Sequence, residues 1–230
     1  MGMTITPAVL FDAGGTLVDT NYFHAVAWFR AFRQVGVGVA MADVHRLIGM
    51  GADRLVQALL PERDPARDDI LHSSHAEHYA TYFGVMQPFV QARELLRDIA
   101  GRGAKVVLAT SANPRELAAL RAALDVEDAL ATVTSSADAA SSKPAPDILQ
   151  AALEQSGVDP EHSIMVGDTV WDVEAATRAG LPCVGVLTGG ISRDELSRAG
   201  AAALYDDVAA LRAELLASPV GALLTRSPVG

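Results

Sequence analysis

The stretch AVLFDAGGTLVDT, residues 8–20, decides how this chain is expected to fold. Its first four residues are apolar without alternation, which is typical of a short strand buried on both faces. The strand is expected to end at Asp12, where the glycines that follow allow a sharp turn and a close approach to a ligand. An aspartate there can act as a nucleophile or a metal ligand, but an ordinary turn after a strand gives the same pattern.

Similar apolar runs recur along the chain and alternate with helical patterns. The expected strands are residues 8–11, 106–109, 131–133, 163–166, 183–186 and 202–205, and the helices between them include 114–123, 146–155 and 170–179. This alternation predicts an α/β fold whose core is a Rossmann-like parallel sheet with helices on both faces.

Residues 21–84 break this alternation. Helical patterns cover 22–34, 42–48, 53–60 and 66–83, with no convincing strand between them. We therefore expect an inserted α-helical cap over residues 21–84 and a discontinuous core made of residues 1–20 and 85–230. The segment from about Ser218 onward is rich in Pro, Gly and Ser and is expected to be a loose tail.

Composition limits the classes of partner. The chain has 230 residues, half of them hydrophobic, and 18 Lys plus Arg against 28 Asp plus Glu, a formal net charge of -10. This balance argues against nucleic acid or an anionic membrane as the main partner. Cys183 is the only cysteine, which excludes an intramolecular disulfide and favours a cytoplasmic location. A monomer and a homodimer both remain open.

Polar residues lie at or just beyond the ends of separate expected strands. They are Asp12, Thr110 in ATSAN (109–113), Lys143 in SSKPAP (141–146), and Asp168 with Asp172 in GDTVWD (167–172). In an open parallel sheet, the carboxyl ends of the strands converge on one crevice where ligands bind. Two carboxylates, a backbone carbonyl and waters suit an octahedral Mg²⁺ site, which makes Asp12 and Asp168 candidate metal ligands.

Each of these residues also has a simpler interpretation. The Thr110 segment could merely cap the next helix through Ser111 or Asn113, and Asp172 could be an ordinary acidic residue of a first helical turn. Lys143 could be a solvated loop lysine, but it is one of only two lysines in the chain, and prolines follow it closely.

These segments, in this order, resemble the haloacid dehalogenase-like superfamily from Val9 to the last strand. The family pattern is an apolar strand with Asp-x-Asp-Gly-Thr-Leu-x-Asp, a strand-end Thr or Ser, a Lys-Pro pair, and Gly-Asp-x-x-x-Asp. Residues 142–148 and 19–28 are particularly similar to the branch of β-phosphoglucomutases and phosphoglycolate phosphatases. That branch carries a helical cap where residues 21–84 stand here.

The resemblance implies how a small phosphorylated metabolite would be handled. Asp12 would attack phosphorus and become a phosphoaspartate. Thr110 and the backbone amides of Ser111 and Ala112 would hold phosphoryl oxygens, and Lys143 would link Asp12 to the phosphate charge. These parts supply the positioning and charge neutralisation that phosphoryl transfer needs.

It also implies a magnesium cofactor. Asp12, Asp168 and the backbone carbonyl of residue 14 would be the protein ligands of Mg²⁺. Asp172 would orient Lys143 or a water on the ion.

Gly14 departs from the family pattern. The family phosphatases have a second aspartate there, which acts as general acid for the leaving group and general base for water. Glycine can do neither, and loss of an acid/base group typically costs about 10²–10⁴-fold in rate. We therefore expect metal and phosphate binding with weak or unusual turnover. A substrate group, His24 or Asp19 could substitute as proton donor, but the sequence favours none of them strongly.

Three other functions are compatible with glycine at position 14 to different degrees. A haloacid dehalogenase needs no proton for its leaving group, but it does not need the metal carboxylate that Asp168 suggests. A phosphonoacetaldehyde hydrolase needs a cap lysine, and residues 21–84 contain none. A non-catalytic relative that binds a phosphorylated metabolite is the remaining alternative.

The cap is expected to choose the substrate. The loop GMGADR (49–54) resembles one that enters the active site, so Arg54 could meet a substrate anion, although a surface salt bridge explains it equally well. His24 is a second candidate substrate contact. His72, His75 and His78 recur every three residues, but this spacing spreads them around a helix and favours a solvated or cap-interface face over a metal site.

Overall fold

The computed structural model describes residues 6–225 and has a single six-stranded sheet at its centre. The strands are β1 (Ala8–Phe11), β2 (Lys105–Ala109), β3 (Leu130–Thr134), β4 (Ser163–Gly167), β5 (Cys183–Val186) and β6 (Ala203–Tyr205). All pairs are parallel and the order is β3-β2-β1-β4-β5-β6. The chain runs outward from β1 to one edge and then returns to start again at β4. The point between β1 and β4 is therefore the place where a doubly wound sheet forms its ligand crevice.

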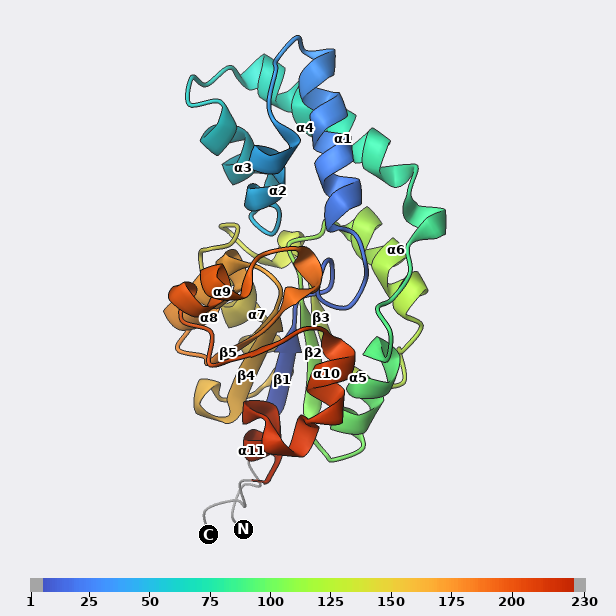
Figure 1. The fold of residues 1–230 in the computed structure, drawn as a ribbon, viewed down its shortest axis with the longest axis vertical. Helices are drawn as coiled ribbons and strands as arrows, with labels where there is room; N and C mark the ends of the chain where they lie inside the picture. The colour runs from blue at the N-terminus through green and yellow to red at the C-terminus, as the bar shows by residue number, and fades with distance from the viewer. Residues whose placement is uncertain (1–5, 226–230) are drawn as a thin grey trace.

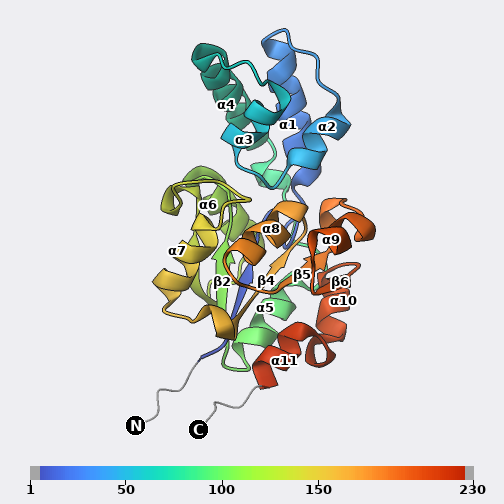
Figure 2. The ribbon, with the colours of Figure 1, turned by 90° about the vertical axis from the view of Figure 1, so that its left-hand side faces the viewer.

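Helices cover both faces of the sheet (Figures 1 and 2). They are α5 (Ala92–Ala100), α6 (Pro114–Leu124), α7 (Asp147–Ser156), α8 (Val170–Arg178), α9 (Arg193–Ala199), α10 (Val208–Ala213) and α11 (Pro219–Thr225). Strand β1 shows why the sheet needs two covers. Its alternate residues Val9 and Phe11 belong to one buried cluster, and Ala8 and Leu10 belong to another. The predicted α/β fold with a Rossmann-like core is confirmed.

Four helices form a separate unit, here named the cap helices: α1 (Asn21–Gln34), α2 (Met41–Leu47), α3 (Ala52–Leu59) and α4 (Pro65–Ala80). They stand over the end of the sheet at which β1 leads into α1 (Figure 1, top). The unit has an apolar cluster of its own, in which Trp28 and Phe32 of α1 pack with residues of the other cap helices such as Val44 and Leu71. Short 3₁₀ helices complete the chain: η1 (Phe83–Val85), η2 (Ser136–Asp138), η3 (Pro160–His162), η4 (Leu187–Gly189) and η5 (Leu215–Ala217).

The expectation of a loose tail from Ser218 is wrong for most of that segment. Residues Pro219–Thr225 form α11, and Val220 and Leu223 are buried in the core. The hydroxyl of Ser218 accepts a hydrogen bond from the Gly221 amide at 3.2 Å, as a helix-capping serine does, and proline follows in the first helical position. The Pro, Gly and Ser content was thus a helix-start signal. The rest of the expected tail, residues 226–230, lies outside the described residues.

Within residues 6–225, no helix is both long enough and apolar enough to cross a lipid bilayer.

Candidate active site

The parallel register brings the polar strand ends to one level. Phe11 pairs with Leu108 of β2 and with Val166 of β4, so Asp12 stands beside the ends of both neighbours. The Asp12 amide donates to the Val166 carbonyl at 3.0 Å, which fixes the start of the glycine loop against β4. Asp168 follows β4 directly. This is the crevice between β1 and β4 that the strand order predicts.

Lys143 joins two of the aspartates. Its Nζ donates to Asp12 Oδ1 and to Asp172 Oδ1, both at 2.7 Å. The side chain is buried, with only 1% of its surface exposed, so it is not the solvated lysine of the simpler interpretation. Burial alone would lower the pKa of Lys143, but the charges of Asp12 and Asp172 outweigh that effect and raise it above its ordinary value. The ammonium is therefore held in its charged form between two carboxylates.

Asp172 caps a helix and also contacts Lys143. It is the third residue of α8, and its Oδ2 accepts hydrogen bonds from the Thr169 amide at 3.0 Å and the Thr169 hydroxyl at 2.6 Å. This is a helix capping box. Its other oxygen accepts from Lys143, so Asp172 anchors the lysine to the start of a rigid helix.

Asp168 is fully buried and is held by two polar side chains from the β1–α1 segment. Thr16 Oγ1 donates to Asp168 Oδ1 at 2.6 Å, and Asn21 Nδ2 donates to Asp168 Oδ2 at 2.8 Å. A Cβ atom added at Gly15 would lie 2.4 Å from Asp168 Oδ2, and one at Gly189 would lie 1.8 Å from it. Only glycine lets these two backbone segments approach the carboxylate so closely.

The three carboxylates suit a divalent cation. Asp12, Asp168 and Asp172 can each offer an oxygen such that all three oxygens lie within 4.8 Å of one another. Burial is the main reason that the pKa of Asp12 rises to about 6, despite the neighbouring Lys143. Burial, followed by the charges of Asp172 and Asp12, also raises the pKa of Asp168 well above its usual range. One ammonium does not balance three buried carboxylates, and a bound Mg²⁺ would supply the missing positive charge.

Gly14 lies next to a buried hydroxyl. A Cβ atom added there would be 2.7 Å from Thr20 Oγ1. Among residues 6–225 that hydroxyl has no hydrogen-bond partner, although Thr20 is fully buried. A side chain at position 14 would therefore meet the Thr20 hydroxyl first.

The segment after β2 has the layout of an anion site. Asn113 caps α6, because its Oδ1 accepts from the Glu116 amide at 3.0 Å. Ser111 and Ala112 precede the cap, and the Ala112 amide donates only a long hydrogen bond, 3.3 Å, to Thr110 Oγ1. Amides at a helix start favour a negatively charged oxygen nearby.

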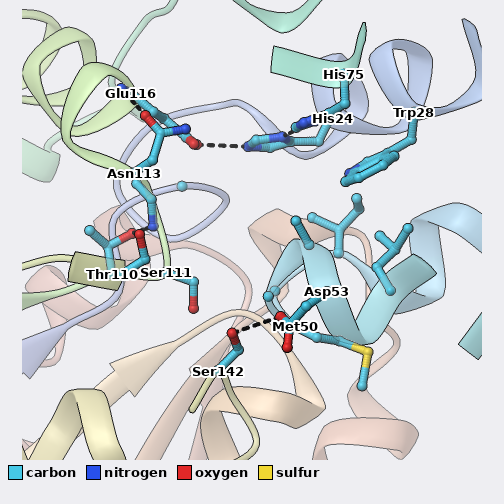
Figure 3. Close-up of a pocket in the computed structure, with 18 of the residues that line it drawn as sticks. His24, Trp28, Met50, Asp53, His75, Thr110, Ser111, Asn113, Glu116 and Ser142 are labelled. Carbon is cyan, nitrogen blue, oxygen red and sulfur yellow. Dashed lines mark hydrogen bonds and ion pairs between the residues drawn. The ribbon is translucent and has the colours of Figure 1, made fainter. Parts of the chain in front are cut away.

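A cavity of about 390 Å³ lies between the cap helices and the sheet. The core side of its lining includes Asp12, Gly14 and the segment from Thr110 to Asn113, and the cap side includes Trp28, Met50 and Leu55. Figure 3 shows Thr110, Ser111 and Asn113 on one wall, across from Trp28 and Met50. Asp53 lies near the rim, where its Oδ1 accepts from the Ser142 hydroxyl at 2.9 Å. Arg54 is not among the lining residues, so its contact with substrate stays a prediction.

His24 lines the cavity, but its two ring nitrogens already have protein partners. Nε2 lies 3.0 Å from Glu116 Oε1, and Nδ1 lies 3.2 Å from His75 Nε2 (Figure 3). Its ring also stacks on Tyr79, with centroids 3.7 Å apart. Any contact between His24 and substrate would have to compete with these bonds.

His75, which contacts His24, also lines the cavity. Its ring stacks on Trp28 at 4.1 Å, and burial is the main reason that its pKa lies well below the ordinary value. In the described part of the chain, the only group of potential ligands close enough to share a metal is the aspartate cluster, so His72, His75 and His78 form no second one.

Sequence reasoning missed three residues of this arrangement: Thr16, Asn21 and Glu116. Thr16 belongs to the glycine-containing stretch, and a hydroxyl there is a visible signal for a ligand or carboxylate partner. Asn21 contacts a residue 147 positions away, which no local pattern reveals. Glu116 looks like any acidic residue in a first helical turn, and only the fold shows that it meets His24.

Comparison with known proteins gives a consistent picture. Residues 6–180 match the haloacid dehalogenase-like hydrolase family. The chain is 31% identical over 214 residues to a phosphoglycolate phosphatase of Rhodospirillum rubrum, with 89% of this chain and 88% of that protein covered. The crystal structure of a hydrolase from Pseudomonas syringae superposes with a TM-score of 0.87 at 30% identity, covering 91% of this chain and 98% of that one.

A further solved structure, a provisionally assigned β-phosphoglucomutase from Bacteroides vulgatus, has a TM-score of 0.85 at 19% identity. The superposition covers 97% of this chain and 92% of that one, and it shows that the two folds are similar. The family match spans most of the chain and includes the β1 loop, Lys143 and the Asp168 segment. The chain therefore belongs to the haloacid dehalogenase-like hydrolase family.

Proposed function

We propose that this protein is a magnesium-dependent phosphatase that acts on a small phosphorylated metabolite through Asp12. The observation that carries the proposal is the buried cluster of Asp12, Lys143, Asp168 and Asp172, of which Asp12 lines the cavity. A carboxylate at the turning point of the sheet, a fixed ammonium and backbone amides just ahead of a helix are what a phosphoryl group needs for binding and attack.

Few groups would supply positive charge at the proposed phosphate site. Lys143 holds Asp12 in place through one carboxylate oxygen and faces the charge that the phosphate brings. Asp12 and Asp168, with the Gly14 carbonyl, would hold Mg²⁺, and the ion when bound supplies positive charge that offsets that of the phosphate. The Thr110 hydroxyl and the amides of Ser111 and Ala112 would orient the phosphoryl oxygens.

The reaction divides into two steps at Asp12. In the first, a carboxylate oxygen of Asp12 bonds to phosphorus, and the bond from phosphorus to the ester oxygen breaks. The departing oxygen takes its proton from water or from the substrate itself, because Gly14 has none to give. In the second step, water attacks the phosphorus of the phosphoaspartate, inorganic phosphate leaves, and the Asp12 carboxylate is restored.

Gly14 affects the two steps unequally, depending on the leaving group. An acidic leaving group such as acetate or p-nitrophenolate departs without protonation, so its first step does not need the missing acid. The second step still lacks a general base. With such substrates the phosphoaspartate should therefore form faster than it breaks down.

Hydrolysis of acetyl phosphate is the direct test. We expect slow, Mg²⁺-dependent release of inorganic phosphate, which is lost in Asp12→Asn and on addition of a chelator. Asp69→Asn serves as a matched control, because Asp69 is an exposed aspartate of α4 and does not line the cavity. Release that continues unchanged in Asp12→Asn refutes the proposed nucleophile.

Gly14 also favours one other function, a non-catalytic relative that binds a phosphorylated metabolite. Phosphate protection of the fold against heat, without any turnover or phosphorylation of Asp12, would support that alternative. The haloacid dehalogenase alternative has less support, because the buried aspartate cluster has a surplus of negative charge suited to a cation.

Two further expectations remain as proposals. We infer that residues 21–84 act as a cap that opens to admit substrate and that residues 1–20 with 85–230 form the core. We also keep the cytoplasmic location, which the one cysteine, free and buried, supports.

A further inference from the structure

The cavity above the phosphate site has an unusual charge balance. Among residues 6–225, no lysine or arginine belongs to its lining. The lining does include the carboxylates of Asp53 and Glu116, in addition to Asp12 on the floor. The positive charge of Lys143 is engaged below by Asp12 and Asp172.

Two arginines that are close in sequence to lining residues are engaged in ion pairs. Arg46 pairs with Glu195 on the core surface, and Arg115 pairs with Glu77 on α4. His75 does not supply a fixed charge, because its burial favours the neutral ring. A second anion on the substrate would thus enter the space without a lysine or arginine to receive it.

The remaining cap-side lining is largely apolar. Trp28, Ile48, Met50, Leu55 and Ala76 contribute to it. Such surface accepts carbon and neutral polar groups, and a carboxylate placed against it loses hydration without gaining a partner.

We propose that this site selects phosphate monoesters whose leaving group carries no negative charge, and that it disfavours carboxylate-bearing esters such as phosphoglycolate. This inference rests on the proposed phosphatase function. It also separates this chain from the activity named for its Rhodospirillum rubrum relative, because we expect the cap to set the selectivity.

Three esters of nearly equal size test the proposal: phosphoglycolate, 2-hydroxyethyl phosphate and 2-aminoethyl phosphate. Their leaving groups end in a carboxylate, a hydroxyl and an ammonium. The unmodified protein is used for kcat/KM, because Gly14→Asp would itself add a carboxylate to the cavity lining. Asp12→Asn, which lacks the nucleophile, is used with Mg²⁺ to measure binding by calorimetry without consuming the ester.

We expect kcat/KM for phosphoglycolate to be at least about tenfold below that for each of the other two, as repulsion and desolvation of one charge predict. The dissociation constants with Asp12→Asn should follow the same order. Asp53→Asn keeps the hydrogen-bond acceptor for Ser142 and removes one negative charge. It should therefore narrow the difference in kcat/KM between phosphoglycolate and the other two esters severalfold. Asp69→Asn, at an exposed aspartate of α4 that is outside the lining, should leave the order unchanged.

A kcat/KM for phosphoglycolate that equals or exceeds the values for the other two esters overturns the inference and leaves the phosphatase function standing. If that preference disappears in Arg54→Ala, the arginine supplies the cation that the lining lacks. Absence of turnover with all three esters and with acetyl phosphate would instead overturn the proposed function itself, and the inference with it.

Discussion

Lys143 lies buried between the carboxylates of Asp12 and Asp172, with Asp168 close by. Replacing it with Met would leave three buried carboxylates without their ammonium, and breaking such a buried pair costs about 3–5 kcal/mol. We expect Lys143→Met to lower the free energy of unfolding by that amount and to abolish phosphate release, as measured by urea unfolding and by acetyl phosphate hydrolysis.

The other lysine provides a matched control. Lys105 begins β2, and its Nζ donates to the Ser156 carbonyl at 2.6 Å, away from the aspartate cluster. Lys105→Met should keep its activity even where it loses some stability. Activity that survives in Lys143→Met would remove that lysine from the mechanism.

We expect Gly14 to be the residue at which the chain departs from the family pattern. Gly14→Asp should raise the rate of ester hydrolysis by about 10²–10⁴-fold, the usual contribution of a general acid and base. Gly14→Asn fills the same space but cannot act as a general acid or base, so it should not raise the rate of ester hydrolysis. Both side chains require the Thr20 hydroxyl to turn aside, so each is also made in a Thr20→Ala background. Fast hydrolysis by the unmodified chain, or equal rates for the Asp and Asn variants, would contradict the role given to position 14.

Several site residues could be predicted because they sit at strand ends. Asp12, Thr110 and Asp168 each follow a buried apolar run, and a parallel sheet brings such ends together. Lys143 and Asp172 needed the family pattern to be recognised as partners. Contacts such as Glu116 with His24 could not be predicted, since they depend on how α6 meets the cap helices.

At the scale of helices and strands, α11 is the element that sequence patterns misjudged. Leu223 has 6% of its surface exposed, and its truncation to Ala should cost about 2–5 kcal/mol of unfolding free energy. Leu216→Ala, at a position 62% exposed, is the matched control and should cost much less. Equal, small effects in urea unfolding would mean that α11 does not pack on the core in solution.

Helices α1 and α4 are joined by a half-buried histidine pair. His24, Trp28 and Tyr79 surround His75, together with His72 and His78 of its own helix, and Glu116 approaches from α6 through His24. Because burial keeps His75 neutral when folded, the unfolded chain binds more protons below its ordinary pKa of about 6.5. Stability should therefore fall as pH drops below that value.

His75→Phe keeps an aromatic ring and removes the titrating group. We expect its Tm to fall less between pH 7.5 and 5.5 than that of the unmodified protein. His78→Phe, on the same helix, is the control and should retain most of the original dependence. An unchanged slope in His75→Phe would show that this histidine does not cause the pH dependence.

The bounds of the strands could be predicted almost to the residue. A strand buried on both faces has to be apolar throughout, so the ends of the apolar run mark the ends of the strand. Val9 and Phe11 face one cluster while Ala8 and Leu10 face the other, which leaves no polar position in β1. Helix ends were less predictable. The helix expected to extend to residue 83 ends at Ala80, because caps and 3₁₀ turns decide the last turn.

For the molecule as a whole, the cap helices contact the core through several polar pairs as well as through apolar residues such as Ala27 and Tyr79. Trp171 Nε1 donates to the Arg46 carbonyl at 3.2 Å, His45 Nε2 lies 2.9 Å from the Gly189 carbonyl, and Asp53 meets Ser142. Contacts of this kind exchange readily with water, which the proposed opening of the cap would require. The net charge of -10 adds a reason for local cations at the site, since the global field repels a phosphate.

The central claim, that Asp12 carries the phosphoryl group, is tested most directly by rapid quenching of the protein with acetyl phosphate and Mg²⁺, followed by peptide mass spectrometry. The account predicts phosphate on the peptide that contains Asp12, its absence in Asp12→Asn, and faster decay in Gly14→Asp. Phosphate release without any phosphorylated Asp12, or phosphate found on a different residue, would contradict it.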